Sequence, residues 1–224
     1  MRREQLINDL SADLKPVRSP GRTRARAAIW LVIATVYSTI VILASGRLRD
    51  GALVNLLEYP WFAVETIVAG SAVLALTIAA LRLSIPSPRN PLLRTLPALV
   101  IAALWIGFYV VGFWQPAHPV STLGVRDHCV LQGLFFSFPS MALLLYYARG
   151  LMPLWPRATG ALAGAAAGAI PAAWMQLACM YIPSHILTHH MATVVLLAVI
   201  GALVGPVALQ RSHTVPRNRG RPIH

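Results

Sequence analysis

The chain has 224 residues, of which 57% are hydrophobic and only 12% are charged, and its formal net charge is +12. A soluble domain carries about a quarter charged residues, so the composition excludes an ordinary soluble protein. A sequence pI near 11.2 is also typical of nucleic-acid binding. The basic residues, however, flank apolar segments and do not form one patch. We therefore expect contact with membrane lipid and no direct nucleic-acid partner.

Six apolar segments are each about long enough to cross a bilayer, which takes ~20 residues. Backbone polar groups cannot stay unpaired in lipid, so each segment is expected to be a helix. The segments are residues 27–46, 61–81, 96–114, 129–148, 158–178 and 190–209. The sequence therefore predicts an all-α integral membrane protein with six transmembrane helices.

The basic residues predict the orientation of these helices. Of the 19 Lys and Arg residues, all but Arg47, Arg49 and Arg126 lie in the terminal segments or in the loops after the second and fourth spans. Cytoplasmic loops carry the excess of Lys and Arg, so both termini are expected in the cytoplasm. Three parts follow: a cytoplasmic helix and basic linker (1–26), a six-helix membrane domain (27–209) and a basic cytoplasmic tail (210–224).

Residues 1–15 have the pattern of a short amphipathic helix. Leu6, Ile7, Leu10 and Leu14 fall on one face at helical spacing, and a proline at position 16 ends the pattern. An isolated helix of this length is marginal in water, so it is expected to pack against something. Two alternatives are open: the inner membrane surface, or the groove of a cytosolic partner protein.

Two features within the spans have predicted roles. Glu65 lies about one turn inside the outer end of the second span, so we expect its carboxylate to reach the membrane interface. Gly160, Gly164 and Gly168 recur four residues apart, a spacing that lets helices approach closely. The fifth span is therefore expected to be the tightly packed central helix, and its glycines to let the fourth and fifth spans slide on each other.

The two cysteines are predicted to face each other on the outer side. Cys129 begins the fourth span and Cys179 follows the fifth, at heights that differ by only ~3 Å. Arg126 and the helix N-terminus are expected to lower the pKa of the Cys129 thiol. Three alternatives are open: a structural disulfide, a reversible redox switch, or a metal site. Histidines that could complete such a metal site are His128, His185, His189 and His190.

No catalytic motif, phosphate-binding glycine loop or paired intramembrane carboxylate is found in the sequence. We therefore expect a protein that is not an enzyme and that needs no cofactor. An alternative is a small membrane transporter or metal-handling protein that uses the outer cysteines and histidines.

The segments LINDLSADLKPV (6–17) and RGLMPLWPRATGALAGAAAGAIPA (149–172), together with the two cysteines, resemble the NrsF family. These bacterial inner-membrane proteins are anti-sigma factors of extracytoplasmic-function sigma factors. The resemblance implies that the N-terminus binds the sigma factor and that Cys129 and Cys179 sense oxidative or metal stress. It assigns sigma-factor binding to Leu6, Ile7, Leu10, Asp13, Pro16 and Val17, beside Leu14 on the apolar helix face.

Overall fold

A computed structural model describes residues 3–12, 23–126 and 128–210 of the chain. These residues form helices joined by loops, with one isolated β-bridge between Ser121 and Tyr181. The elements are α1 (Arg3–Ala12), α2 (Thr23–Ser45), α3 (Ala52–Glu58), α4 (Pro60–Leu83), α5 (Pro91–Val111), α6 (Cys129–Arg149), α7 (Pro156–Ala178), α8 (Pro183–His185), the π-helix η1 (Ile186–Met191) and α9 (Ala192–Leu209). The predicted all-α fold is confirmed.

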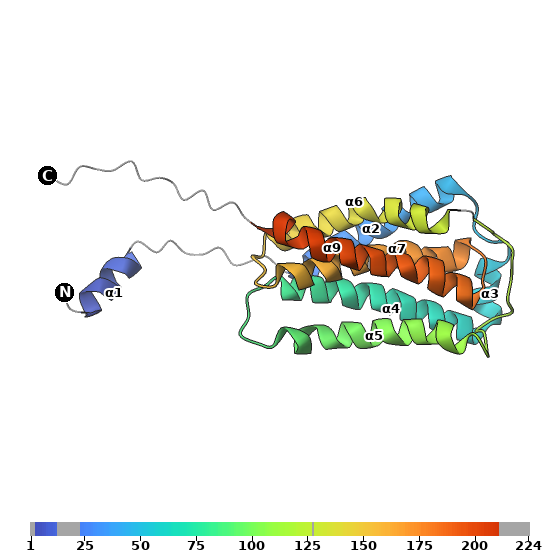
Figure 1. Cartoon of the computed structure of the whole chain (residues 1–224), viewed down its shortest axis with the longest axis horizontal. Helices are drawn as coiled ribbons and strands as arrows, with labels where there is room; N and C mark the ends of the chain where they lie inside the picture. Colours follow the sequence, from blue (N-terminus) through green and yellow to red (C-terminus); the bar gives the residue numbers. More distant parts are fainter. Residues whose placement is uncertain (1–2, 13–22, 127, 211–224) are drawn as a thin grey trace.

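Among the described residues, six helical segments are long and apolar enough to cross a membrane, as predicted. They run side by side in one bundle (Figure 1). The sixth is the continuous segment Pro183–Leu209, formed by α8, η1 and α9. It begins seven residues before the predicted start at position 190. The third begins at Pro91 because the Asn90 side chain caps the helix, accepting a hydrogen bond from the Leu92 backbone N–H at 2.9 Å.

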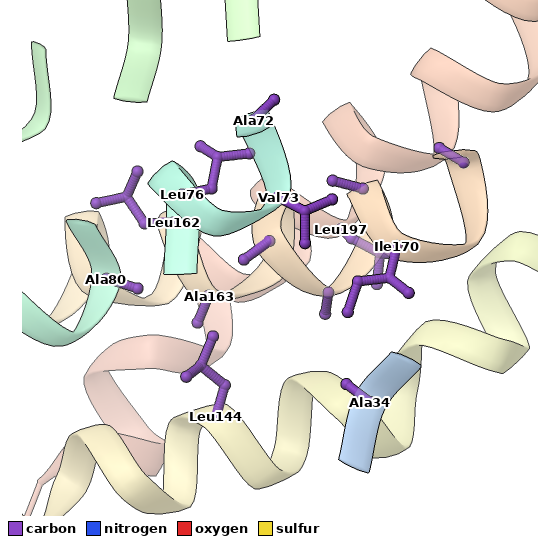
Figure 2. Close-up of a cluster of buried hydrophobic side chains, with 14 of the residues drawn as sticks. Ala34, Ala72, Val73, Leu76, Ala80, Leu144, Leu162, Ala163, Ile170 and Leu197 are labelled. Carbon is purple, nitrogen blue, oxygen red and sulfur yellow. The ribbon is translucent and has the colours of Figure 1, made fainter. Parts of the chain in front are cut away.

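Helix α7 is the central element of the bundle, as predicted. It packs against α9, α4, α6 and α2, whereas α5 lies outside α4. Figure 2 shows how side chains from the surrounding helices gather around it, among them Leu76 of α4, Leu144 of α6 and Leu197 of α9, beside Leu162 and Ala163 of α7. Because α7 consists mostly of alanine and glycine, the neighbouring helices can approach its backbone closely.

The closest helix contact joins α7 to α9. A methyl group on Gly160 would collide with the backbone carbonyl of Gly201, and one on Gly164 with the carbonyl of Leu197. The prediction that these glycines lie between the fourth and fifth spans and let them slide on each other is therefore wrong. They face the sixth span, because α9 carries its own glycines, Gly201 and Gly205, on the matching face.

Two short elements were not predicted. Helix α3 lies in the connection between the first two spans and follows Gly51, whose φ of 76° is a left-handed conformation that favours glycine. The π-helix η1 lies in the sixth span. Both belong to the end of the bundle where α6 begins and α7 ends, called the cysteine end below.

Candidate functional site

The two cysteines meet at the cysteine end. Cys129 is the first residue of α6, and Cys179 directly follows α7. Their Sγ atoms are 3.2 Å apart, and both residues are free thiols that are almost completely buried. The predicted juxtaposition of two sulfurs at one depth on neighbouring helices is confirmed by this distance.

Two histidines complete a compact cluster with the cysteines. The Nε2 atom of His185 lies 3.5 Å from the Cys179 sulfur. His190 is 2% exposed, and neither of its ring nitrogens has a hydrogen-bond partner in the described structure. The side chains of Cys129, Cys179, His185 and His190 each offer one ligand atom, and these four atoms lie within 4.8 Å of one another. This group is called the Cys/His cluster below.

The π-helix brings the two histidines of the cluster together. In an α-helix, residues five apart point ~140° away from each other around the axis. The wider i→i+5 turn of a π-helix places such residues on one face. His185 immediately precedes η1 and His190 lies within it, and their ring centroids are 5.2 Å apart. Local widening of the sixth span is thus what assembles the histidine half of the cluster.

The remaining candidate histidines lie outside the Cys/His cluster. His128 precedes α6 and is exposed. His189 stacks on His185 with a centroid distance of 4.2 Å, but its Nδ1 atom lies 2.8 Å from the Thr188 hydroxyl and 3.2 Å from the His185 carbonyl oxygen. The structure therefore brings together four of the six residues that the sequence offered as metal ligands.

Arg126 lies near the Cys129 thiol, as predicted, but its guanidinium is hydrogen-bonded to other groups. The Arg126 guanidinium donates hydrogen bonds to the Ser45 hydroxyl and the Arg47 carbonyl, at 2.9 and 3.1 Å, and the Arg126 backbone carbonyl oxygen lies 3.2 Å from the Cys129 sulfur. Cys179 is the sulfur beside the imidazoles. Its pKa is lowered, first because the Cys129 thiol donates a hydrogen bond to it and then because of His190. Cys179 is consequently the better nucleophile of the pair.

A buried polar chain begins beside Cys179 and runs into the bundle. Arg49 donates a hydrogen bond to the Cys179 carbonyl at 3.3 Å and contacts Nε2 of His118 at 3.0 Å. The His118 ring stacks on Tyr181 with centroids 3.8 Å apart, and the Tyr181 hydroxyl donates to the Glu65 carboxylate at 2.6 Å. The members of this group are Arg49 after α2, His118 after α5, Tyr181 after α7 and Glu65 in α4. The buried polar chain thus connects four parts of the bundle.

The Glu65 side chain does not extend to the surface of the bundle, as the predicted interfacial position requires. Its residue is fully buried, because the Tyr181 ring and the loop that carries it cover the start of α4. The sequence did contain a signal for this chain. Among the described residues, Arg49 is one of only three basic residues in the connections at the cysteine end, and Glu65 lies inside an apolar span, so both differ from the pattern of their surroundings.

The electrostatics of this polar chain follow from burial. Burial and then the charge of Arg49 lower the pKa of His118 to about 4, so His118 is neutral at neutral pH and its Nε2 accepts the Arg49 proton. Burial lowers the pKa of Arg49, which still remains a cation. Burial and then Glu65 raise the pKa of Tyr181, which therefore keeps its proton and donates it to the carboxylate.

The N-terminal segment forms a helix, as predicted over residues 1–15, but α1 is described only from Arg3 to Ala12. Leu6, Ile7 and Leu10 lie in this helix, and the Ile7 side chain is 54% exposed. The other residues assigned to partner binding lie outside the described residues: Asp13, Leu14, Pro16 and Val17.

Comparison with known protein families gives a match over most of the chain. The model of the NrsF family, described as negative regulator of sigma F, matches residues 10–210. This range contains all six apolar helices, the Cys/His cluster and the buried polar chain. No curated protein and no solved structure matches the chain. With a match over nearly the whole chain, this six-span protein belongs to the NrsF family of negative regulators of sigma F.

Proposed function

We propose that this protein is an anti-sigma factor of the bacterial inner membrane, with both termini in the cytoplasm. Its N-terminal segment, residues 6–17, holds an extracytoplasmic-function sigma factor. Oxidation of the cysteine pair on the outer side releases that sigma factor. Family membership supports a sigma-factor partner, and the placement of all but three basic residues supports the orientation.

The observation that carries the sensing role is the 3.2 Å distance between the two sulfurs. A disulfide needs an S–S distance of ~2.05 Å, so the sulfurs have to approach by a little more than ~1 Å. With a peroxide as oxidant, the Cys179 thiolate attacks one oxygen, the O–O bond breaks, and a sulfenic acid and hydroxide form. The Cys129 thiol then attacks that sulfur and expels the second oxygen as water. Both electrons come from the two thiols.

Contacts at the cysteine end support a route from this pair to the N-terminus. The backbone N–H of Arg49, four residues after α2, donates to the Leu177 carbonyl at 3.1 Å, and its side chain donates to the Cys179 carbonyl. Arg126, three residues before Cys129, holds Ser45, the last residue of α2. The ends of α6 and α7 are thus both tied to the end of α2. The other end of α2 leads to the sigma-binding segment, so α2 carries the movement.

The energy required is available from one disulfide. Changing the bound fraction of sigma factor from 99% to 1% needs ~5.5 kcal/mol of differential affinity. A disulfide contributes typically ~2–4 kcal/mol, and up to ~5. Disulfide formation can therefore supply most of the free-energy difference between a closed and a released state.

The proposal is tested with Cys129→Ser, Cys179→Ser and the double variant, expressed at wild-type levels in cells that carry a reporter for the sigma factor. All three variants should share one phenotype and fail to respond to peroxide, because a single thiol cannot form the intramolecular bond. Met180→Leu is the matched control, since it removes the oxidisable sulfur next to Cys179 and should leave the response intact. Normal induction by peroxide in the double cysteine variant would exclude the pair as the sensor.

A further inference from the structure

We infer that the Cys/His cluster binds one zinc ion when both cysteines are reduced. The inference rests on the proposed function in one respect, because it identifies the resting state of the proposed sensor pair. It replaces a bare dithiol with a site built from two sulfur and two nitrogen ligands, Cys129, Cys179, His185 and His190.

The spacing of the ligand atoms is close to that of a zinc site. In a tetrahedral zinc site with Zn–S bonds of ~2.3 Å, two sulfurs lie ~3.8 Å apart. The observed Sγ–Sγ distance of 3.2 Å differs from that value by only about half of the movement that a disulfide requires. All four ligand atoms already lie within 4.8 Å of one another, although they come from three separate parts of the chain: the start of α6, the residue after α7, and the start of the sixth span.

His190 is a buried imidazole that needs a partner. Its side chain is 2% exposed, and both ring nitrogens are buried without a hydrogen-bond partner in the described structure. A buried polar group without a partner destabilises a fold by ~1–3 kcal/mol, and buried polar side chains are normally satisfied. Here the unpartnered imidazole belongs to the Cys/His cluster, and a bound metal ion takes its lone pair. The π-helix that aligns it with His185 is a rare conformation that recurs at functional sites.

The donor set selects the metal. Two thiolates and two imidazoles are typical ligands of tetrahedral zinc. Their charge also suits burial, because two thiolates neutralise a divalent cation when both imidazoles are neutral. A neutral complex avoids the large free-energy penalty of an uncompensated charge in a low-dielectric interior.

Zinc also defines the outcome of oxidation. When a peroxide takes two electrons from the two zinc-bound thiolates, the S–S bond forms, the O–O bond breaks, and two protons from solvent complete two water molecules. The disulfide no longer offers thiolate ligands, so the zinc ion leaves. Oxidation thus releases the sixth span, with His185 and His190, from α6 and α7, which the disulfide then joins to each other.

The test uses the full-length chain purified in detergent under anaerobic reducing conditions and dialysed against zinc. Elemental analysis should find one zinc per chain. Cobalt(II), used in place of zinc, should give the thiolate charge-transfer and ligand-field absorption of a tetrahedral site. His190→Gln should lose at least tenfold in zinc affinity. His189→Gln is the matched control, because its ring stacks on His185 yet lies outside the Cys/His cluster, and it should retain the metal.

Two results would overturn the zinc site: reduced wild-type protein that retains no zinc and gives no tetrahedral cobalt spectrum, or equal loss of zinc in the His189 and His190 variants. The wild-type spectrum decides the matter even if a variant fails to fold. This failure is distinct from failure of the proposed function. If the wild-type protein binds no zinc but the cysteine pair still governs the peroxide response, only the zinc site is refuted. If the wild-type protein binds zinc but the double cysteine variant responds normally to peroxide, the sensing role is refuted and the zinc site stands.

Discussion

Replacing Gly164 with alanine should destabilise the bundle, because the added methyl group meets the Leu197 backbone of α9. A flexible side chain could move aside, but a helix backbone cannot, so α7 and α9 must separate. Overpacking of this kind destabilises a protein by ~1–3 kcal/mol. Alanine is a better helix former than glycine by up to ~1 kcal/mol, which offsets part of this loss. We therefore expect a net loss of ~1–2 kcal/mol in the free energy of unfolding.

The assay is reversible unfolding of the purified protein in mixed micelles, followed by tryptophan fluorescence as the fraction of denaturing detergent rises. Gly107→Ala is the matched control, because Gly107 is also a helical glycine, in α5. Apart from the adjacent backbone of α5 itself, no described atom lies within 4 Å of the added methyl group. That variant should be as stable as wild type or more stable. If Gly164→Ala were as stable as Gly107→Ala, the close α7–α9 contact would be refuted.

Four further outcomes are expected. Reporter fusions should place the C-terminus in the cytoplasm and the loop 115–128 outside, and a C-terminus outside would refute the proposed orientation. Changing Leu6 and Leu10 together to Asp should raise sigma-dependent transcription without stress, since each lost apolar contact costs ~1.5–3 kcal/mol; unchanged repression would reject the docking role. Tyr181→Phe should lower the free energy of unfolding by ~1–3 kcal/mol, because a buried carboxylate loses its donor; equal denaturation midpoints would contradict this. The pKa of His118 is about 4 in the folded protein and ~6.5 when unfolded, so the unfolded state binds more protons between these values. The contribution of His118 to the free energy of unfolding should therefore be fully present above pH ~6.5 and decrease toward pH ~4. In unfolding curves recorded at several pH values, His118→Gln should reduce this pH dependence.

The amino-acid sequence was sufficient to predict the six spans and the meeting of the cysteines. Both follow from one-dimensional quantities. The length of an apolar run must match the bilayer, and the depth of Cys129 and Cys179 follows from counting residues along two helices that share a short turn. The central position of α7 was predictable for the same reason, because a helix of alanine and glycine has little apolar surface to offer lipid and much backbone to offer neighbours.

Contacts between elements distant in the sequence were not predictable in this way. Helix periodicity assigns the glycines of α7 to one face, but only the packing of six helices determines that this face meets α9 and not α6. In the same way, Glu65 has the sequence position of an interfacial carboxylate, and only the fold brings Tyr181 to it across more than a hundred residues.

The Cys/His cluster was predicted in part from the sequence and in part required the tertiary structure. Its four residues were among the candidates that the sequence placed at the outer ends of the spans, together with His128 and His189, which lie outside it. If residues 185–190 formed an α-helix, the side chains of His185 and His190 would point in different directions. If they formed a loop, the sequence would not predict where either side chain lies. The choice among six candidates depended on a local π-helix, whose widened turn is stabilised by tertiary packing and has no signature in the hydrophobic pattern.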